Sequence, residues 1–181
     1  MPRSLVVRLM LFAGLALPAT ALLSATPASA AAKSCNISHT TTVSPGLEQP
    51  PAGDAADAVQ TFKVSATLSS CTGAPGITKG TSTGTLKSTS PSKPTCADLA
   101  TPGSKASGTV SVTWNNGKKS AATLTVTVDG PQHGKLSGKV TSGLFKGSTI
   151  GGASSFNIAT GNCSDATPVT KLTGSGTITL S

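Results

Sequence analysis

The chain has 181 residues, of which only 3% are aromatic, and its 14 basic residues outnumber six acidic ones for a net charge of +8. Glycine, serine and threonine are abundant, while apolar residues recur with the period of two that is typical of strands. This composition argues against a helical enzyme and against a disordered chain, and it suits an exported all-β domain with short turns.

The start of the chain has the pattern of a secretory signal peptide. Arg3 and Arg8 precede an apolar run from Leu9 to Leu23, and Ala28-Ser29-Ala30 supplies the small residues that signal peptidase requires. A retained membrane anchor is the alternative, but the apolar run is short for one. We therefore expect residues 1–30 to be removed.

The remaining residues, 31–181, are expected to form a single secreted domain without a membrane span. Their length of 151 residues suits one domain with a real core. A lipoprotein anchored at Cys35 is disfavoured because Lys33 lies beside it with no apolar residue nearby. Both arginines leave with the leader, so twelve lysines face six acidic residues, a net charge of +6.

About eight strands are expected, separated by turns and by two long loops at Ser44–Ala58 and Ser90–Ser104. In the second loop, Thr95 followed by Asp98 resembles a capping box for one helical turn. The predicted strands are, in chain order, Ser34–Val43, Thr61–Ser70, Lys79–Ser88, two arms within Ala106–Gly130, a strand through Leu136–Val140, a looser one ending near Ile158, and Lys171–Ser181.

The clearest element is a hairpin within Ala106–Gly130. A two-residue loop would place the apolar residues of its two arms on different faces. A three-residue loop ending at Gly117 pairs Trp114 with Lys118 and Val110 with Ala122, so that both apolar sets share one face. The glycine then takes the left-handed position of the turn.

These patterns predict an all-β fold of about eight antiparallel strands, either a β-sandwich or a flattened barrel, immunoglobulin-like or jelly-roll-like. Even-numbered residues from Phe62 to Leu180 should meet in one interior, and Cys35 and Ile37 should lie on one side of the first strand. The tight Ser142–Gly147 segment should connect two of the later strands.

Four cysteines, an even number in an exported chain, indicate two disulfides. A zinc site is the alternative, but the chain has no C-x-x-C pair, and His39 and His133 are far apart in sequence. Antiparallel strands that alternate in direction bring cysteines together at the two ends of the domain. The expected bridges are Cys35–Cys71 and Cys96–Cys163.

Candidate reactive groups are few. Gly80-Thr81-Ser82-Thr83-Gly84 has the letters of a nucleophile elbow but lies within a predicted strand, without the helix that the motif requires. Asp129 and His133 flank a Gly-Pro turn and could be imagined in a triad. We predict no catalytic, cofactor-binding or metal-ligating residue, and we expect no enzyme activity.

The acidic residues of the first long loop, Glu48, Asp54 and Asp57, could be imagined around calcium, but they lack EF-hand spacing and are expected to be solvated. Trp114 lies near Lys118 and Lys119, yet its parity places it in the core rather than on a ligand platform.

The expected partners follow from the charge. Lysines on outward positions permit attraction to an anionic cell-envelope polymer and also guard sheet edges. Arginine is absent after the leader, which disfavours nucleic acid. We therefore expect an anionic envelope polymer or another protein as the partner.

The chain resembles small exported proteins of unknown function from high-GC Gram-positive bacteria. The resemblance lies in the A-x-A signal site, the W-N-N-G hairpin at Trp114–Gly117, the S-G-L-F-K-G segment at Ser142–Gly147 and the four cysteines. It covers most of the mature chain and implies an immunoglobulin-like or jelly-roll sandwich, without catalytic residues.

Three hypotheses for function follow. The leading one is a non-enzymatic exported module that acts by binding or at the cell surface. The second is a protease inhibitor that presents the Ser92–Cys96 stretch, although Pro94 after Lys93 makes a poor site for a lysine-directed protease. The third is a hydrolase that uses His133.

Overall fold

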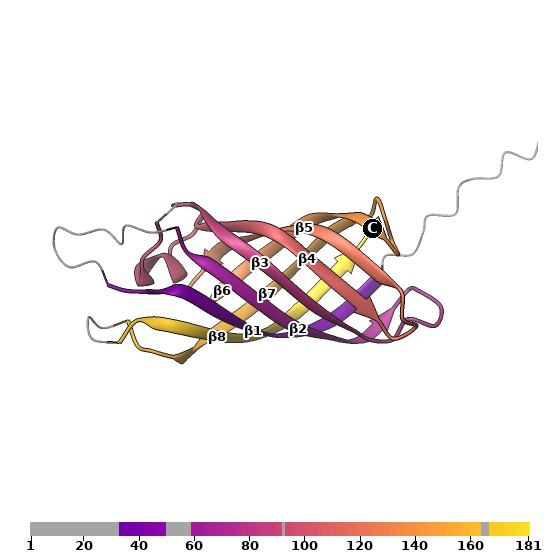
Figure 1. Cartoon of the computed structure of the whole chain (residues 1–181), viewed down its shortest axis with the longest axis horizontal. Helices are drawn as coiled ribbons and strands as arrows, with labels where there is room; N and C mark the ends of the chain where they lie inside the picture. Colours follow the sequence, from indigo (N-terminus) through magenta and orange to yellow (C-terminus); the bar gives the residue numbers. More distant parts are fainter. Residues whose placement is uncertain (1–32, 50–58, 92, 164–166) are drawn as a thin grey trace, which may run out of the picture.

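The computed structural model describes residues 33–49, 59–91, 93–163 and 167–181. Within them, eight antiparallel strands form one sheet that closes on itself, with neighbours in chain order around the barrel (Figure 1). The elements are β1 (Lys33–Leu47), β2 (Thr61–Thr72), β3 (Gly80–Ser90), the 3-10 helix η1 (Cys96–Leu99), β4 (Lys105–Trp114), β5 (Lys119–Gly130), β6 (His133–Gly143), β7 (Thr149–Thr160) and β8 (Val169–Leu180).

The all-β fold and its eight antiparallel strands confirm the prediction. Of the two expected architectures, the sheet is closed into a barrel, and the two-sheet sandwich, immunoglobulin-like or jelly-roll-like, is corrected. The sheet is closed because its first strand, β1, pairs with its last strand, β8. Ile37 of β1 is opposite Leu68 of β2 on one side and Gly176 of β8 on the other. Inward and outward residues alternate in the same way in a sandwich and in a barrel, so the alternation does not distinguish them.

The hairpin formed by β4 and β5 has the predicted register. Val110 is opposite Ala122, and the Trp114 backbone N–H donates to the Lys118 carbonyl at 2.9 Å. Gly117 has a φ of 79°, in the left-handed region that glycine enters without strain. The three-residue loop is therefore confirmed.

Inward-facing glycines allow neighbouring strands to approach closely as the sheet coils. A Cβ at Gly108 would clash with the Thr85 carbonyl of β3, and one at Gly138 would clash with the Thr123 carbonyl of β5. Glycine at such positions permits the bends that close a small barrel.

The barrel has two distinct ends (Figure 1). At one end, which we call the termini end, β1 begins, β8 finishes, and short turns join β2 to β3, β4 to β5 and β6 to β7. The other end, which we call the helix end, carries η1 and the remaining connections. A hydrophobic cluster that includes Trp114 and Ile77 fills the termini end, and a second one that includes Leu47 and Phe156 lies at the helix end.

Both predicted disulfides are confirmed. Cys35–Cys71 joins β1 to β2 at the termini end, and Cys96–Cys163 joins η1 to the segment after β7 at the helix end. The strand directions that predicted these pairs are the same in a barrel as in a sandwich, so the pairing was right although the architecture differs.

The first long loop is shorter than expected, and the second has nearly the expected bounds, between the end of β3 at Ser90 and the start of β4 at Lys105. β1 continues to Leu47, so only the part of the Ser44–Ala58 loop after it remains, and residues 50–58 lie outside the described residues. In the second loop, the predicted helical turn is present as η1. The Asp98 carboxylate accepts hydrogen bonds from the Thr95 backbone N–H at 2.7 Å and from the Thr95 hydroxyl at 3.0 Å.

Candidate binding cavity

The interior of the barrel is not completely filled. An eight-stranded barrel is just wide enough for side chains to fill it or for one small ligand to lie inside. Here many inward positions carry small residues, which leave a cavity of about 190 Å³. These residues include Gly80, Ser82, Gly84, Ala66, Ala106, Gly108, Gly134, Gly138, Gly152, Ser154, Gly174 and Gly176.

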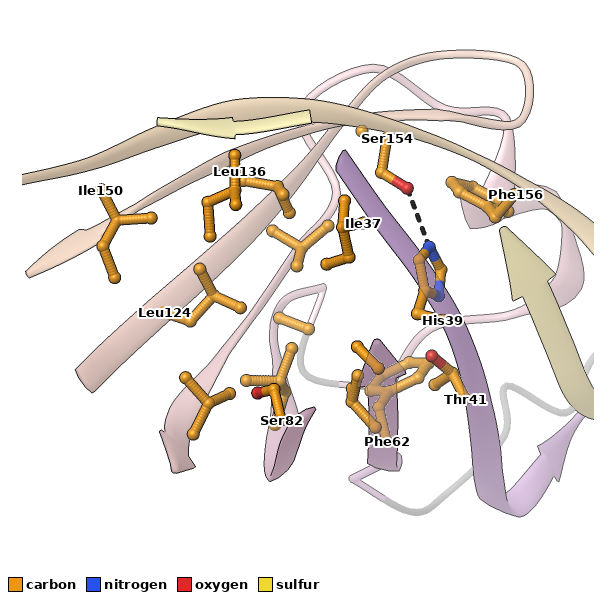
Figure 2. Close-up of a pocket in the computed structure, with 18 of the residues that line it drawn as sticks. Ile37, His39, Thr41, Phe62, Ser82, Leu124, Leu136, Ile150, Ser154 and Phe156 are labelled. Atoms are coloured by element: carbon orange, nitrogen blue, oxygen red, sulfur yellow. Dashed lines mark hydrogen bonds between the residues drawn. The ribbon is translucent and has the colours of Figure 1, made fainter. Parts of the chain in front are cut away.

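All eight strands contribute to the lining, and most of the lining side chains are apolar. In Figure 2, Ile37, Leu124, Leu136 and Ile150 gather on one side of the view. On the other side the cavity is bounded by two phenylalanines and a few polar groups. The labelled residues there are His39, Thr41, Phe62, Ser154 and Phe156.

His39 is an ionisable group of this lining that lies within a strand, whereas Lys33 and Lys105 line the cavity from the ends of strands. Its Nε2 lies 2.8 Å from the Ser154 hydroxyl oxygen, so the ring reaches from β1 past β8 to β7 (Figure 2). Gly174 of β8 lies between them and is opposite His39 in the sheet. A Cβ at Gly174 would lie only 2.5 Å from Nε2, so the absence of a side chain there makes room for the ring.

The hydrogen bonds of Ser154 indicate the tautomer of His39. The Ser154 hydroxyl is 3.1 Å from the Ser175 carbonyl oxygen, which can only accept its proton. We therefore assign Nε2–H as the donor to Ser154, which leaves Nδ1 as a bare acceptor. Nδ1 is buried and has no hydrogen-bond partner. A neutral imidazole fits this environment, and burial lowers the pKa of His39 below its ordinary value of 6.5.

We expect the stability of the barrel to fall as the pH is lowered through about 6.5, the pKa of His39 in the unfolded chain. Because the pKa in the folded state is lower, the unfolded chain binds more protons below that pH, and the free energy of unfolding decreases. The decrease ends once the pH passes below the folded-state pKa. The nearest residues on the adjoining strands, Ala66, Ser154 and Gly174, are not ionisable.

Urea unfolding between about pH 8 and about pH 5 measures this dependence. The variant His39→Gln should lose that part of the pH dependence. His133→Gln should retain it, since His133 is exposed at the start of β6. Equal pH dependence in the wild type and His39→Gln would contradict the assignment.

Each end of the cavity has its own closure. At the termini end, Trp114 and Phe145 pack edge to face with their ring centroids 5.3 Å apart, and the Trp114 indole donates to Ser120 at 2.8 Å. At the helix end, Pro94 and Leu99 of the connection that carries η1 line the cavity. The cover at the helix end is thus a short irregular segment, whereas the termini end is closed by packed aromatic side chains.

The structure does not bring the sequence-predicted reactive groups together. The Gly80–Gly84 stretch lies inside β3 with Ser82 facing the cavity, and no helix follows it. Asp129 and His133 are exposed on either side of the turn between β5 and β6. Trp114 is buried, as its parity predicted.

Within the described ranges, no group of three or more His, Cys, Asp and Glu side chains is placed to hold a metal ion. Nor does any helix in the described part of the chain combine the length and the apolar character needed to cross a membrane.

Fold and cavity together define the class of this protein as an eight-stranded up-and-down β-barrel with an internal, mainly apolar cavity. Comparison of the sequence with protein-family models and with curated proteins finds no match.

Sequence reasoning did not identify His39 as a cavity residue, although a signal was present. Cys35 and Ile37 were expected to share one side of the first strand, and His39 is two residues further along that strand. Period-two alternation places it on the same side. Its contact with Ser154 spans 115 positions in the sequence and depends on the closure of the barrel.

Proposed function

We propose that this protein is an exported, non-enzymatic binding protein that holds a small, largely apolar ligand inside its barrel. The observation that carries the proposal is the cavity of about 190 Å³ lined mainly by apolar side chains. Filling such a space with well-packed side chains would stabilise the barrel, so an unfilled interior costs stability. A binding function explains why that cost is retained.

The size and shape of the cavity limit the ligand. An apolar cavity of about 150 Å³ in another protein stays dry and accepts benzene, so this space suits a slender alkyl chain or a single ring. The lining extends from Lys33 at the termini end to Leu99 at the helix end. An extended chain fits that length better than a compact molecule does.

The alternative function of a protease inhibitor gains no support from the described residues of the Ser92–Cys96 stretch. Pro94 and Cys96 are both buried, whereas an inhibitory loop has to present its residues to the protease. Ser92 itself lies outside the described residues.

The test reduces the cavity by substitution and measures, by calorimetry, the binding of two ligands of matching size, benzene and n-octane. Leu124 faces the cavity from β5, and Thr123 beside it points outward. We expect Leu124→Trp to weaken binding at least tenfold by occupying the space. A tenfold loss corresponds to about 1.4 kcal/mol of binding free energy. Thr123→Trp, the matched control, should leave the affinity within about twofold, because this side chain points away from the cavity.

Circular dichroism would establish that both variants fold, and Val64→Phe provides a second way to reduce the cavity, from β2. Equal binding by the wild type and both filled variants would overturn the proposal. So would the absence of binding of both benzene and n-octane by the wild type.

A further inference from the structure

The acidic side chains that the structure describes all lie at one end of the barrel. The acidic residues that the structure describes are Glu48, Asp98 and Asp129. They lie in the connections or strand ends of the helix end, where the Glu48 carbonyl accepts a hydrogen bond from the Cys96 N–H of η1. No acidic side chain among the described residues lies at the termini end. The remaining three acids, Asp54, Asp57 and Asp165, are outside the described residues.

At the helix end, Lys93, Lys105 and Lys171 accompany these acidic residues, whereas the termini end carries lysines without any described acidic residue. We call this group the basic rim, and it consists of Lys33, Lys79, Lys118, Lys119 and Lys146. They come from the start of β1 and from all three short turns. Four of them are exposed, and Lys33 is half-buried.

Contacts between the turns hold these lysines in one continuous surface. The Asn115 N–H donates to the Lys79 carbonyl at 3.1 Å, which joins two of the turns. The Leu144 N–H donates to the Lys119 carbonyl at 2.9 Å, which joins the third. Lys33 Nζ lies 5.2 Å from the centre of the Phe145 ring, in the same turn as Lys146. The backbone therefore fixes the spacing of the rim.

We propose that the basic rim docks the barrel end-on onto a membrane surface that carries anionic phosphate headgroups. Each lysine near such a surface contributes about 1 kcal/mol of attraction, and the other end of the barrel, with its acidic residues, faces away. Leu144 and Phe145 are only half-buried between the lysines of the rim. Apolar and aromatic side chains beside basic ones are typical of groups that settle at the headgroup boundary.

A membrane fits this surface better than a linear wall polymer does. The rim is the end of a barrel, with its lysines distributed over four segments around the barrel axis. That arrangement meets a surface with many lysines at once, whereas a single polymer chain is best held in a groove. Of the rim lysines only Lys33 also lines the cavity, so docking through the four lysines of the turns does not depend on the bound ligand.

The test measures sedimentation of the protein with vesicles of phosphatidylglycerol and of phosphatidylcholine at low and high salt. We expect binding to the anionic vesicles, weakened by salt because ions screen exposed charges over about 10 Å at 0.1 M. The triple variant Lys118→Glu/Lys119→Glu/Lys146→Glu should bind at least tenfold more weakly.

A matched control changes the net charge by the same amount on the wall of the barrel. Lys63, Lys135 and Lys139 are exposed on β2 and β6, and Lys63→Glu/Lys135→Glu/Lys139→Glu should bind within about threefold of the wild type. Equal loss in both triple variants would overturn the proposal, because net charge alone would then account for binding. Binding to poly(glycerol phosphate) but not to phosphatidylglycerol vesicles would overturn it in favour of a wall polymer.

Discussion

Trp114→Ala is expected to lower the free energy of unfolding by about 3–5 kcal/mol, which is the usual cost of removing a buried tryptophan. The side chain is 5% exposed and belongs to the cluster that fills the termini end. Its loss removes the edge-to-face contact with Phe145 and leaves a void beneath the β6–β7 turn. The indole hydrogen bond to Ser120 is lost as well.

Urea unfolding followed by circular dichroism measures this change, since the variant has no tryptophan for fluorescence. Trp114→Phe separates packing from hydrogen bonding. It keeps an aromatic ring and loses the N–H donor, so we expect it to destabilise the barrel less than Trp114→Ala does. The lost hydrogen bond should cost about 1–2 kcal/mol, in addition to the cost of the smaller ring. A loss below about 1 kcal/mol in Trp114→Ala would mean that the residue is not part of the core.

Removal of the Cys96–Cys163 bridge by Cys96→Ala/Cys163→Ala is expected to cost about 4 kcal/mol. The bridge closes a segment of 67 residues, and the entropy that it removes from the unfolded chain grows with that length. It also joins η1, whose contacts cover the helix end of the cavity, to the segment after β7.

The second bridge is the natural control. Cys35 and Cys71 are separated by 36 residues, and they lie on adjacent paired strands where Ser34 is already opposite Thr72. Cys35→Ala/Cys71→Ala should therefore destabilise the barrel by less than removal of the longer-range bridge. Urea midpoints of the two double variants make the comparison, with mass spectrometry to check that the other bridge is intact. The reverse order would show that chain entropy does not govern these bridges.

The local pattern of the sequence was sufficient for the strands and for the direction in which their side chains point. Alternation of apolar and polar residues located Trp114 in the interior, and the need to keep two apolar sets on one face determined the hairpin register. Strand direction then predicted both disulfides. These features depend on residues that are close in sequence or on the alternating direction of consecutive strands. Both can be read from the order of residues in the chain.

The start of the first long loop was less well predicted. Ser44–Leu47 was expected to begin a loop because it contains proline and glycine, yet these residues complete β1. Leu47 is opposite Val169 of β8 there and is fully buried. The distant strand supplies the pairing and packing that outweigh the turn preference of these residues.

By itself, then, the sequence determined the all-β class, the eight strands, their inward faces and the pairing of the cysteines. Only the tertiary structure decided that the sheet closes into a barrel, because closure depends on hydrogen bonds between β1 and β8 at opposite ends of the described chain. The cavity and the contact of His39 with Ser154 follow from that closure. Each of them joins residues that are brought together by the circular order of the strands, and no local periodicity encodes that order.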